Sequence, residues 1–384
     1  MWRNIASNAL TFLVVLVFLG GGVLIWAQRE YDTAGPLSQA ICVDVPRGST
    51  FTTVSETLGQ QGAVSSPMLM RLGADYSEKS DQLKAGSYLV PERASMAEIV
   101  DIVTRGGAST CGTEVIYRIG VNSAQVEVRE LDPATGRFEE VAKFDPAAEE
   151  DPEEYTEVRQ AEDTRYRVAL AEGVTSWQVV EELKSVDLLD GDVEVPAEGS
   201  LAPNSYEVAP GDTRADLIGR MQEAQEAILA EAWANRADEL PLESPEEALT
   251  LASIVEKETG VAAERPQVAS VFVNRLRRGM RLQTDPTVIY GITDGEGVLG
   301  RGIRQSELRQ ATPYNTYVIE GLPPTPIANP GRASIEAALN PAETPYVFFV
   351  ADGTGGHAFA ETLDEHNANV ARWREIEAER DAGN

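Results

Sequence analysis

The hydrophobic pattern of the chain begins with an uninterrupted apolar run near the N-terminus. Residues 9–27 (ALTFLVVLVFLGGGVLIWA) are uncharged over about 19 residues, close to the ~20 that a helix needs to cross a bilayer. Trp2 and Trp26 stand at its two ends, where aromatic rings favour the membrane interface. A cleaved signal peptide is the alternative, but its apolar core would span only about 7–15 residues, and no small-x-small cleavage site follows cleanly. The pattern therefore predicts an uncleaved transmembrane helix at 9–27, a short cytoplasmic segment at 1–8, and all remaining residues outside.

Extended and helical patterns then predict a small α+β module at residues 37–110. An extended VDVP segment leads through Gly48 into a helix, a second helix follows, and the extended segment AGSYLVP precedes a helix capped by Ser95. Part of this order recurs, because RVALAEGVTSWQVVEEL at 167–183 matches VDVPRGSTFTTVSETL at 43–58. A duplicated or split β-α element is the simplest interpretation.

The region at 111–165 combines an alternating pattern with a dense acidic run. VIYRIGVNSAQVEVREL alternates apolar and polar side chains, which predicts a hairpin, and the carboxylate-rich run after it predicts a solvated loop. Calcium binding is the alternative function, but the acidic side chains lack the spacing and the central glycine of an EF-hand loop. We therefore interpret this region as a solvated acidic insertion.

From residue 212 onward the pattern turns helical. Thr213 or the aspartate before it is expected to cap a long amphipathic helix, and SPEE at Ser244 forms a capping box at the start of the next. Gly260 and Gly279 are expected to end two successive helices. The rest is rich in loops, with a helix at ASIEAAL, a strand at YVFFVAD and a terminal helix. The sequence predicts an α+β fold whose last part is mainly helical with short strands.

Composition narrows the class of protein. The 384 residues suggest two or three domains at about 150 residues per domain, which excludes a peptide hormone or a single small module. The chain has 32 basic and 62 acidic residues, a net charge of −30, while 42% of its residues are hydrophobic, so it can still bury a core. Because nucleic-acid binding needs clustered Lys and Arg and the chain has no basic stripe, DNA and RNA are poor partners.

The two cysteines, Cys42 and Cys111, both lie in the part predicted to be outside. An oxidising compartment would allow them to pair, and two unrelated thiols are the alternative. No C-x-x-C motif occurs, and the histidines are limited to His357 and His366. These counts argue against a zinc site built on several His or Cys ligands.

The EEALTLASIVEKETG helix carries the candidate for acid chemistry. Its buried stripe is expected to consist of Leu251, Ala252, Ile254 and Val255. Ser253 and Lys257 are expected to point away from this stripe, with Glu256 and Glu258 flanking it on opposite sides. Such a glutamate is commonly a surface residue. Glu258 stands next to the helix end at Gly260, however, where partial desolvation would raise its pKa towards the value of a general acid.

Two downstream loops are rich in uncharged polar groups and tyrosine. RLQTDPTVIYG at 281–291 and TPYNTYVIEGLPPTPIANPG at 312–331 interleave these groups with Pro and Gly, which fix the shape of a loop. Amides, hydroxyls and aromatic rings suit a sugar, with its many hydroxyls and apolar ring faces. Ordinary loop chemistry is the alternative reading of the same residues.

Long, ordered motifs give the chain a resemblance to a known family. They are ASIVEKET at 252–259, VASVFVNRLRRGMRLQTDPTVIYG at 268–291, TPYNTY at 312–317, GLPPTPIANPG at 321–331 and YVFFVADGTGGHAF at 346–359. They resemble the endolytic murein transglycosylase family (MltG, or YceG-like) over most of residues 198–370. EGSLAPNSY at 198–206 is similar to a further motif of that family, with Ser205 where Thr is usual. The module at 37–110 resembles the family's LysM-like subdomain, whereas the acidic region departs from its shorter members.

The resemblance implies a lytic transglycosylase that cuts nascent peptidoglycan strands between N-acetylmuramic acid and N-acetylglucosamine, leaving a 1,6-anhydro end. The catalytic glutamate of the family falls on Glu258, and Glu256 is the alternative acid. Because the nucleophile belongs to the substrate, a second catalytic carboxylate is not required. The residues expected to line the cleft and bind substrate are Gln283, Thr284, Asp285, Tyr290, Asn315 and Tyr317.

The resemblance also sets the expected location and partners. It implies a catalytic domain at 166–384, a single-pass protein of the bacterial cytoplasmic (inner) membrane with its bulk periplasmic or extracytoplasmic, and cell-wall synthases as partners. No cofactor and no metal is expected. A non-catalytic glycan-binding scaffold of the wall-synthesis machinery is the alternative function. A serine or metal-dependent hydrolase is disfavoured, because G-x-S-x-G is absent and histidines are few.

Overall fold

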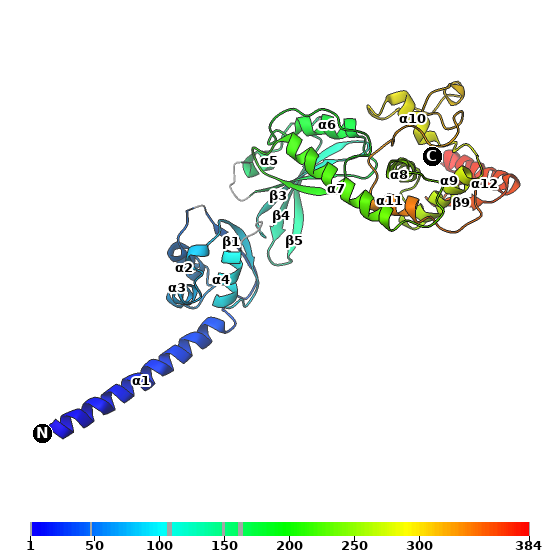
Figure 1. Ribbon diagram of the computed structural model, residues 1–384. Coiled ribbons are helices and arrows are strands. Elements are labelled where there is room, and N and C mark those ends of the chain that lie inside the picture. The colour runs from blue at the N-terminus through cyan, green and yellow to red at the C-terminus, as the bar shows by residue number, and fades with distance from the viewer. Residues whose placement is uncertain (1, 47, 106–109, 148–149, 160–163, 384) are drawn as a thin grey trace. The chain divides into compact units, whose positions relative to one another are not determined.

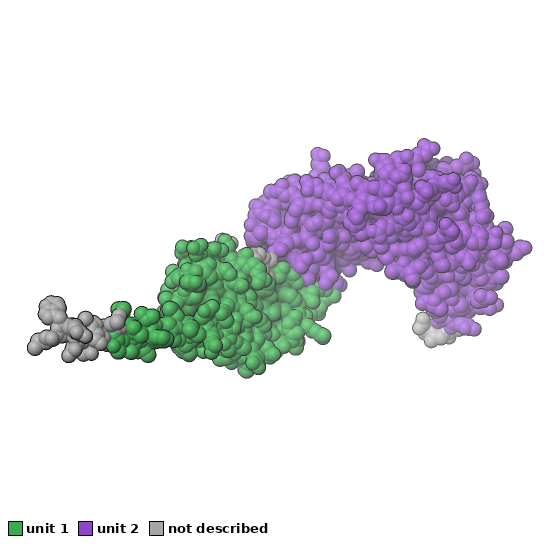
Figure 2. Space-filling view, turned by 60° about the horizontal axis from the view of Figure 1, so that its bottom comes forward, with its two compact units in different colours: residues 1–115, 127–143, 151–165 green, residues 116–126, 144–150, 166–384 purple. Residues whose placement is uncertain are grey.

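The computed structural model describes residues 2–46, 48–105, 110–147, 150–159 and 164–383 (Figure 1). The chain forms two compact units, coloured separately in Figure 2. One comprises residues 1–115, 127–143 and 151–165, and the other comprises residues 116–126, 144–150 and 166–384.

Helix α1 (Trp2–Asp32) contains the predicted apolar run and continues beyond it. Within its segment Thr11–Asp32, an 18-residue stretch has a mean hydropathy of 2.1 and none of that stretch is buried by the rest of the chain. The segment is therefore long and apolar enough to cross a membrane. The helix ends where Thr33 donates both its backbone N–H and its hydroxyl to the carbonyl of Arg29, at 2.9 and 2.6 Å.

The first module after α1 runs β1 (Ile41–Val45), α2 (Phe51–Gln60), α3 (Pro67–Tyr76), a 3₁₀ turn η1 (Ser80–Gln82), β2 (Gly86–Val90) and α4 (Met96–Arg105). β1 and β2 are antiparallel, with Val43 opposite Tyr88. The cap residues Thr50 and Ser66 accept backbone N–H bonds at the starts of α2 and α3, as their chemistry requires. The module encloses its own core, whose fully buried members include Leu58, Met70, Ile99, Val100 and Val103.

The disulfide between Cys42 and Cys111 ties β1 to the segment after α4. The two Cα atoms are 5.7 Å apart, and the bond closes a sequence separation of 69 residues. Cys111 is buried, at 1% exposure. Of the two possibilities open from the sequence, the structure therefore has the paired cysteines.

A five-stranded sheet follows, in the order β5-β4-β3-β6-β7. Its strands are β3 (Thr113–Ile119), β4 (Ala124–Asp132), β5 (Arg137–Phe144), β6 (Arg165–Leu170) and β7 (Ser205–Val208). β3 and β4 form the predicted hairpin. The prediction of a loop directly after it was wrong, because β5 and the short helix α5 (Glu153–Val158) occupy part of the acidic region. β5 is an edge strand with mostly exposed side chains, so it lacks the buried face that would have marked it in the sequence.

The recurrence seen in the sequence is a structural repeat. Gly48 (φ 80°) and Gly173 (φ 81°) make the same left-handed turn after β1 and β6. Each turn leads to a threonine cap and a ten-residue helix, α2 in one case and α6 (Ser176–Ser185) in the other. β6 and β7 pair antiparallel, as β1 and β2 do. Tyr88 and Tyr206 each donate a phenolic hydrogen bond to the carbonyl four residues earlier, at 3.1 and 2.7 Å.

The helical part of the second unit builds on α7 (Arg214–Ala234), α8 (Pro245–Glu258), α9 (Arg265–Arg277) and α11 (Arg332–Leu339). The other elements are η2 (Ala262–Glu264), α10 (Asp285–Thr293), η3 (Glu307–Arg309), a β8 (Phe348–Ala351)–β9 (His357–Ala360) hairpin and α12 (Leu363–Gly383). The predicted starts of α7 and α8 are confirmed, because the side chains of Thr213 and Ser244 accept backbone N–H bonds there. α8 packs against α9 and α11, and its core includes Leu251, Ile254, Val255, Phe272 and Ile335.

Candidate active site

Helix α8 is covered on a second face in addition to the apolar stripe that its sequence predicts. The stripe of Leu251, Ala252, Ile254 and Val255 is fully buried, as predicted. Ser253 and Lys257, which were predicted to point away from this stripe, are covered by other parts of the chain. Ser253 is 0% exposed and its hydroxyl accepts the Ile327 N–H at 3.0 Å, while Lys257 Nζ donates to the Gly173 carbonyl at 3.1 Å. A distant loop and the Gly173 turn therefore cover the second face of the helix.

Glu258 is the last residue of α8 and is partly buried. Its Oε1 accepts a hydrogen bond from the Thr284 hydroxyl. The pKa of the Glu258 carboxyl is raised, and burial is the largest cause. The charge of Asp285 raises this pKa further. The Thr284 bond, His357 and Arg275 lower it, but by less than burial raises it. The group therefore holds its proton at higher pH than an ordinary glutamate does, as a general acid must.

Glu256, the alternative acid, has a different environment. Its side chain is 6% exposed, and its Oε2 accepts the Gly331 N–H at 3.0 Å. The guanidinium of Arg265 lies 3.7 Å from its other oxygen. These contacts hold the Glu256 carboxylate against the loop that covers α8. The carboxylate thereby helps to hold the fold together.

Buried threonines hold the partner of Glu258 in place. Thr284 is 3% exposed, and its backbone N–H donates to the Thr316 hydroxyl at 3.0 Å. Thr287 donates to the Thr284 carbonyl at 2.8 Å and bonds the Thr316 hydroxyl at 2.9 Å. Just before them, Gln283 is exposed and has a φ of 48°, a left-handed conformation that is uncommon for a residue with a Cβ. Its N–H donates to the Thr316 carbonyl at 3.2 Å.

Asp285 and Tyr317 form a pair at the start of α10. The phenolic hydroxyl of Tyr317 donates to Asp285 Oδ1 at 2.7 Å. Asp285 is exposed, and the pKa of Tyr317 is raised by burial and by its bond to this carboxylate. Since the charge of Asp285 also acts on Glu258, the structure brings Thr284, Asp285 and Tyr317 together around the carboxyl of Glu258.

Tyr290, in the last turns of α10, pairs with a carboxylate that the sequence analysis did not single out. Its hydroxyl donates to Glu198 Oε2 at 3.2 Å, and its ring lies 4.9 Å from that of Tyr314. Glu198 Oε1 accepts the Ser176 N–H at 2.9 Å, and burial raises the pKa of this carboxyl. The EGSLAPNSY motif contained Glu198, but nothing in the sequence placed it beside α10.

Asn315 is an interior residue of its loop. It is 1% exposed, and its Nδ2 donates to the carbonyls of Glu307 and Gln310 at 3.0 and 2.7 Å. Its Oδ1 accepts the Tyr317 N–H at 3.1 Å. The amide thereby shapes the loop that carries Tyr317, and its role in binding substrate stays a prediction.

Two further side chains of the second unit, those of Arg275 and His357, also act on Glu258. Arg275 is 8% exposed and donates from Nε to the Val347 carbonyl at 2.6 Å and from Nη1 to the Leu282 carbonyl at 2.7 Å. His357 Nδ1 lies 2.8 Å from Glu264 Oε2. The sequence did not indicate this role of Arg275, because an arginine at the end of a helix commonly faces solvent.

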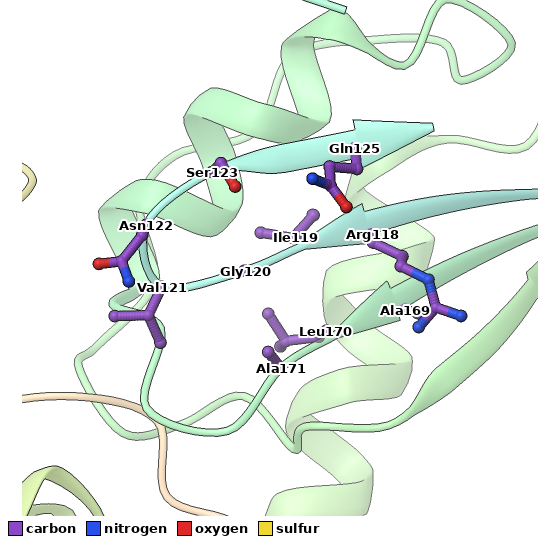
Figure 3. Close-up of a pocket in the computed structure, with 10 residues that line it drawn as sticks. All are labelled: Arg118, Ile119, Gly120, Val121, Asn122, Ser123, Gln125, Ala169, Leu170 and Ala171. Atoms are coloured by element: carbon purple, nitrogen blue, oxygen red, sulfur yellow. The ribbon is translucent and has the colours of Figure 1, made fainter. Parts of the chain in front are cut away.

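A cavity of about 390 Å³ lies elsewhere in the same unit, at the end of the sheet (Figure 3). The β3–β4 turn and the end of β6 line it, with Arg118, Gln125 and Leu170 among its residues. None of the predicted site residues borders this cavity.

The model of the YceG-like family matches residues 43–372. The chain belongs to the YceG-like family. This match begins well before the motifs that carried the resemblance and includes nearly all of the first module and the whole acidic region.

Two relatives of this chain bear the same name. The endolytic murein transglycosylase of Bacillus subtilis (strain 168) is 28% identical over 349 residues, covering 90% of this chain and 89% of that protein. The protein of the same name from Streptococcus pneumoniae serotype 2 is 26% identical over 379 residues, covering 96% of this chain and 65% of that protein. A crystal structure of a YceG-like protein from Listeria monocytogenes is 24% identical, with a TM-score of 0.46, covering 86% of this chain and 98% of that one.

Proposed function

We propose that this YceG-like protein is an endolytic lytic transglycosylase of peptidoglycan, with Glu258 as its acid and base. The observation that carries the proposal is the environment of Glu258: a partly buried carboxyl of raised pKa at a helix end, bonded to the Thr284 hydroxyl. The name endolytic murein transglycosylase, borne by relatives aligned over 90% and 96% of this chain, supports the same activity.

The reaction needs one group that first gives and then takes a proton. Protonated Glu258 donates to the oxygen linking N-acetylmuramic acid to N-acetylglucosamine as the bond from that oxygen to C1 breaks. The resulting carboxylate removes the proton of the muramoyl 6-hydroxyl, whose oxygen bonds to C1 and closes the 1,6-anhydro ring. Glu258 ends the cycle protonated, and no water is consumed. Glu256 is unsuited to this role because Gly331 and Arg265 occupy its carboxylate.

The residues around Glu258 would position the strand. Exposed Gln283 and the Asp285–Tyr317 pair offer an amide, a carboxylate and an aromatic ring, which suit sugar hydroxyls and ring faces. Thr284, Tyr290 and Asn315 complete the proposed binding set, Thr284 by its bond to Glu258 and Asn315 by holding the loop of Tyr317.

The proposed setting is the outer face of the bacterial cytoplasmic membrane. In it, α1 crosses the bilayer once with its N-terminus in the cytoplasm, and the first module is LysM-like. The Cys42–Cys111 disulfide supports an oxidising compartment for the rest of the chain. Cell-wall synthases are the proposed protein partners, and cutting within nascent strands would limit their length.

The test is mass spectrometry of the products after the full-length protein has acted on uncrosslinked glycan strands. We expect anhydro-muramoyl ends, lighter than hydrolysed ends by one water, and their loss in Glu258→Gln with an unchanged melting temperature or a higher one. Ordinary reducing ends would mean hydrolysis. Intact strands that still bind the wild-type protein would instead favour the glycan-binding scaffold.

A further inference from the structure

Helix α3 exposes an apolar stripe. Met68, Leu72 and Tyr76 are 64%, 52% and 94% exposed. Their spacing of four residues puts them on one face of the helix. Among the described residues of 33–105, no other large hydrophobic side chain is exposed to this extent. The opposite face of α3 is buried through Met70 and Ala74, so the helix has one apolar face in the core and a second one in solvent.

Helix α3 lies against the end of α1 (Figure 1). The ring of Tyr31 packs so closely on Gly73 of α3 that a Cβ there would lie 2.1 Å from the ring. The hydroxyl of Ser65, just before α3, donates to Glu30 Oε1 at 2.7 Å. α3 is thereby fastened to the last turn of α1, with Gly73 next to Leu72 in the chain.

The height of α3 above a membrane follows from α1. Tyr31 is four residues beyond Ala27, the end of the apolar run, which is ~6 Å along the axis at ~1.5 Å per residue. The polar layer on each side of the ~30 Å hydrocarbon core is ~5–8 Å thick. If α1 crosses the bilayer, a helix packed against Tyr31 therefore lies at the depth of the lipid headgroups.

We propose that Met68, Leu72 and Tyr76 form a membrane-contact surface that seats the first module on the bilayer beside α1. The occupant is the interfacial layer of the bilayer that holds α1. Tyr76 has the apolar body and polar tip favoured at that depth, where Met68 and Leu72 bury apolar area. α3 carries one basic and one acidic residue, Arg71 and Asp75, so charge does not drive the contact and it should form on zwitterionic lipid. The inference rests on the proposed crossing of the membrane by α1.

The test places a probe on the stripe in the full-length protein. Both native cysteines are in the disulfide, so a single introduced cysteine can carry an environment-sensitive fluorophore in phosphatidylcholine nanodiscs that contain spin-labelled lipid. Leu72→Cys reports the stripe. Val141→Cys, on β5 and 45% exposed, is the matched apolar control, and Val17→Cys reports the span of α1. We expect strong quenching at 17, clear quenching at 72 by a label near the headgroups, and none at 141.

Each other outcome overturns the inference for a distinct reason. Quenching at 17 with none at 72 would leave the anchor intact and remove the membrane contact of α3. No quenching at 17 would show that α1 does not cross the membrane, and this would also overturn the membrane contact of α3. The proposed transglycosylase activity would not be affected by that outcome.

A second experiment tests the stripe without labelling it. A probe at Asp75→Cys is compared with and without the changes Met68→Ser, Leu72→Ser and Tyr76→Ser, which alter exposed side chains only. We expect at least a twofold loss of lipid quenching in the serine variant, with quenching at Val17→Cys unchanged. Equal quenching of the two proteins would contradict a role for the stripe.

Discussion

Thr284 donates its hydroxyl hydrogen bond to Glu258 from 26 residues further along the chain. The bond joins the start of α10 to the end of α8. Thr316 and Thr287 hydrogen-bond to the backbone of Thr284, and this fixes the position of its hydroxyl. The carboxyl therefore has a fixed orientation before any substrate arrives. In the proposed reaction it is also the group whose protonation state sets the rate.

Thr284→Val tests this bond at constant volume. Because the hydrogen bond lowers the pKa of Glu258, its loss should raise that pKa and move the high-pH fall of kcat/KM to higher pH. The lost orientation should reduce kcat by about 10–100-fold, because a small misplacement of a catalytic group is costly. Thr284→Ser, which keeps the hydroxyl, should restore both. A slow variant with an unshifted pH profile would leave Thr284 with a packing role.

Asp285→Asn tests the charge beside the acid. The Asp285 carboxylate raises the pKa of Glu258, so its removal should lower that pKa. The acid is active when protonated, so the high-pH fall in kcat/KM should move towards lower pH. Tyr317→Phe is the control, because it removes the 2.7 Å bond to Asp285 and leaves the charge. It should not shift the profile to lower pH, and equal acid shifts in both variants would argue against the electrostatic explanation.

Replacing Glu258 by glutamine and replacing Glu256 by glutamine should change the stability of the fold in opposite directions near neutral pH. The pKa of folded Glu258 is raised, so its stabilising contribution is present below the unfolded pKa and is lost as pH rises through the folded pKa. Glu258→Gln should therefore raise the melting temperature near neutral pH and have little effect below pH ~4. Glu256→Gln weakens the contact with Arg265 and should lower stability by about 1–3 kcal/mol. Calorimetry across pH checks both signs; destabilisation by Glu258→Gln at neutral pH would contradict the assignment.

The disulfide should stabilise the first unit selectively. Replacing Cys42 and Cys111 by alanine should cost that unit about 2–4 kcal/mol, because the bond constrains a long segment of the unfolded chain. Glycan cleavage should persist, since Glu258 and its partners lie in the other unit. Thermal unfolding with and without a reductant measures the first effect. A loss of cleavage by the folded variant would show that the units are functionally coupled.

Helix starts, the β-α repeat and the buried stripe of α8 could be predicted from the sequence, because they depend on local chemistry. Ser244 and Thr213 begin α8 and α7 because their side chains satisfy free N–H groups of the first turn, whatever surrounds the helix. The β-α repeat was visible for the same reason, since the turn at Gly173 and its threonine cap are local requirements. The buried stripe of α8 followed from its period.

The sequence by itself determined the apolar span, the caps, the repeat and the motifs that identify the family, because each depends on neighbouring residues or on a linear pattern. Only the tertiary structure decided which polar groups are buried. Ser253 and Lys257 face chain segments that are distant in sequence, and Glu198 meets Tyr290 from 92 residues away. Periodicity reports which face of a helix is apolar. It does not report which distant segments cover the other face. Those segments bind the carboxylate of Glu256 and leave Glu258 as the acid.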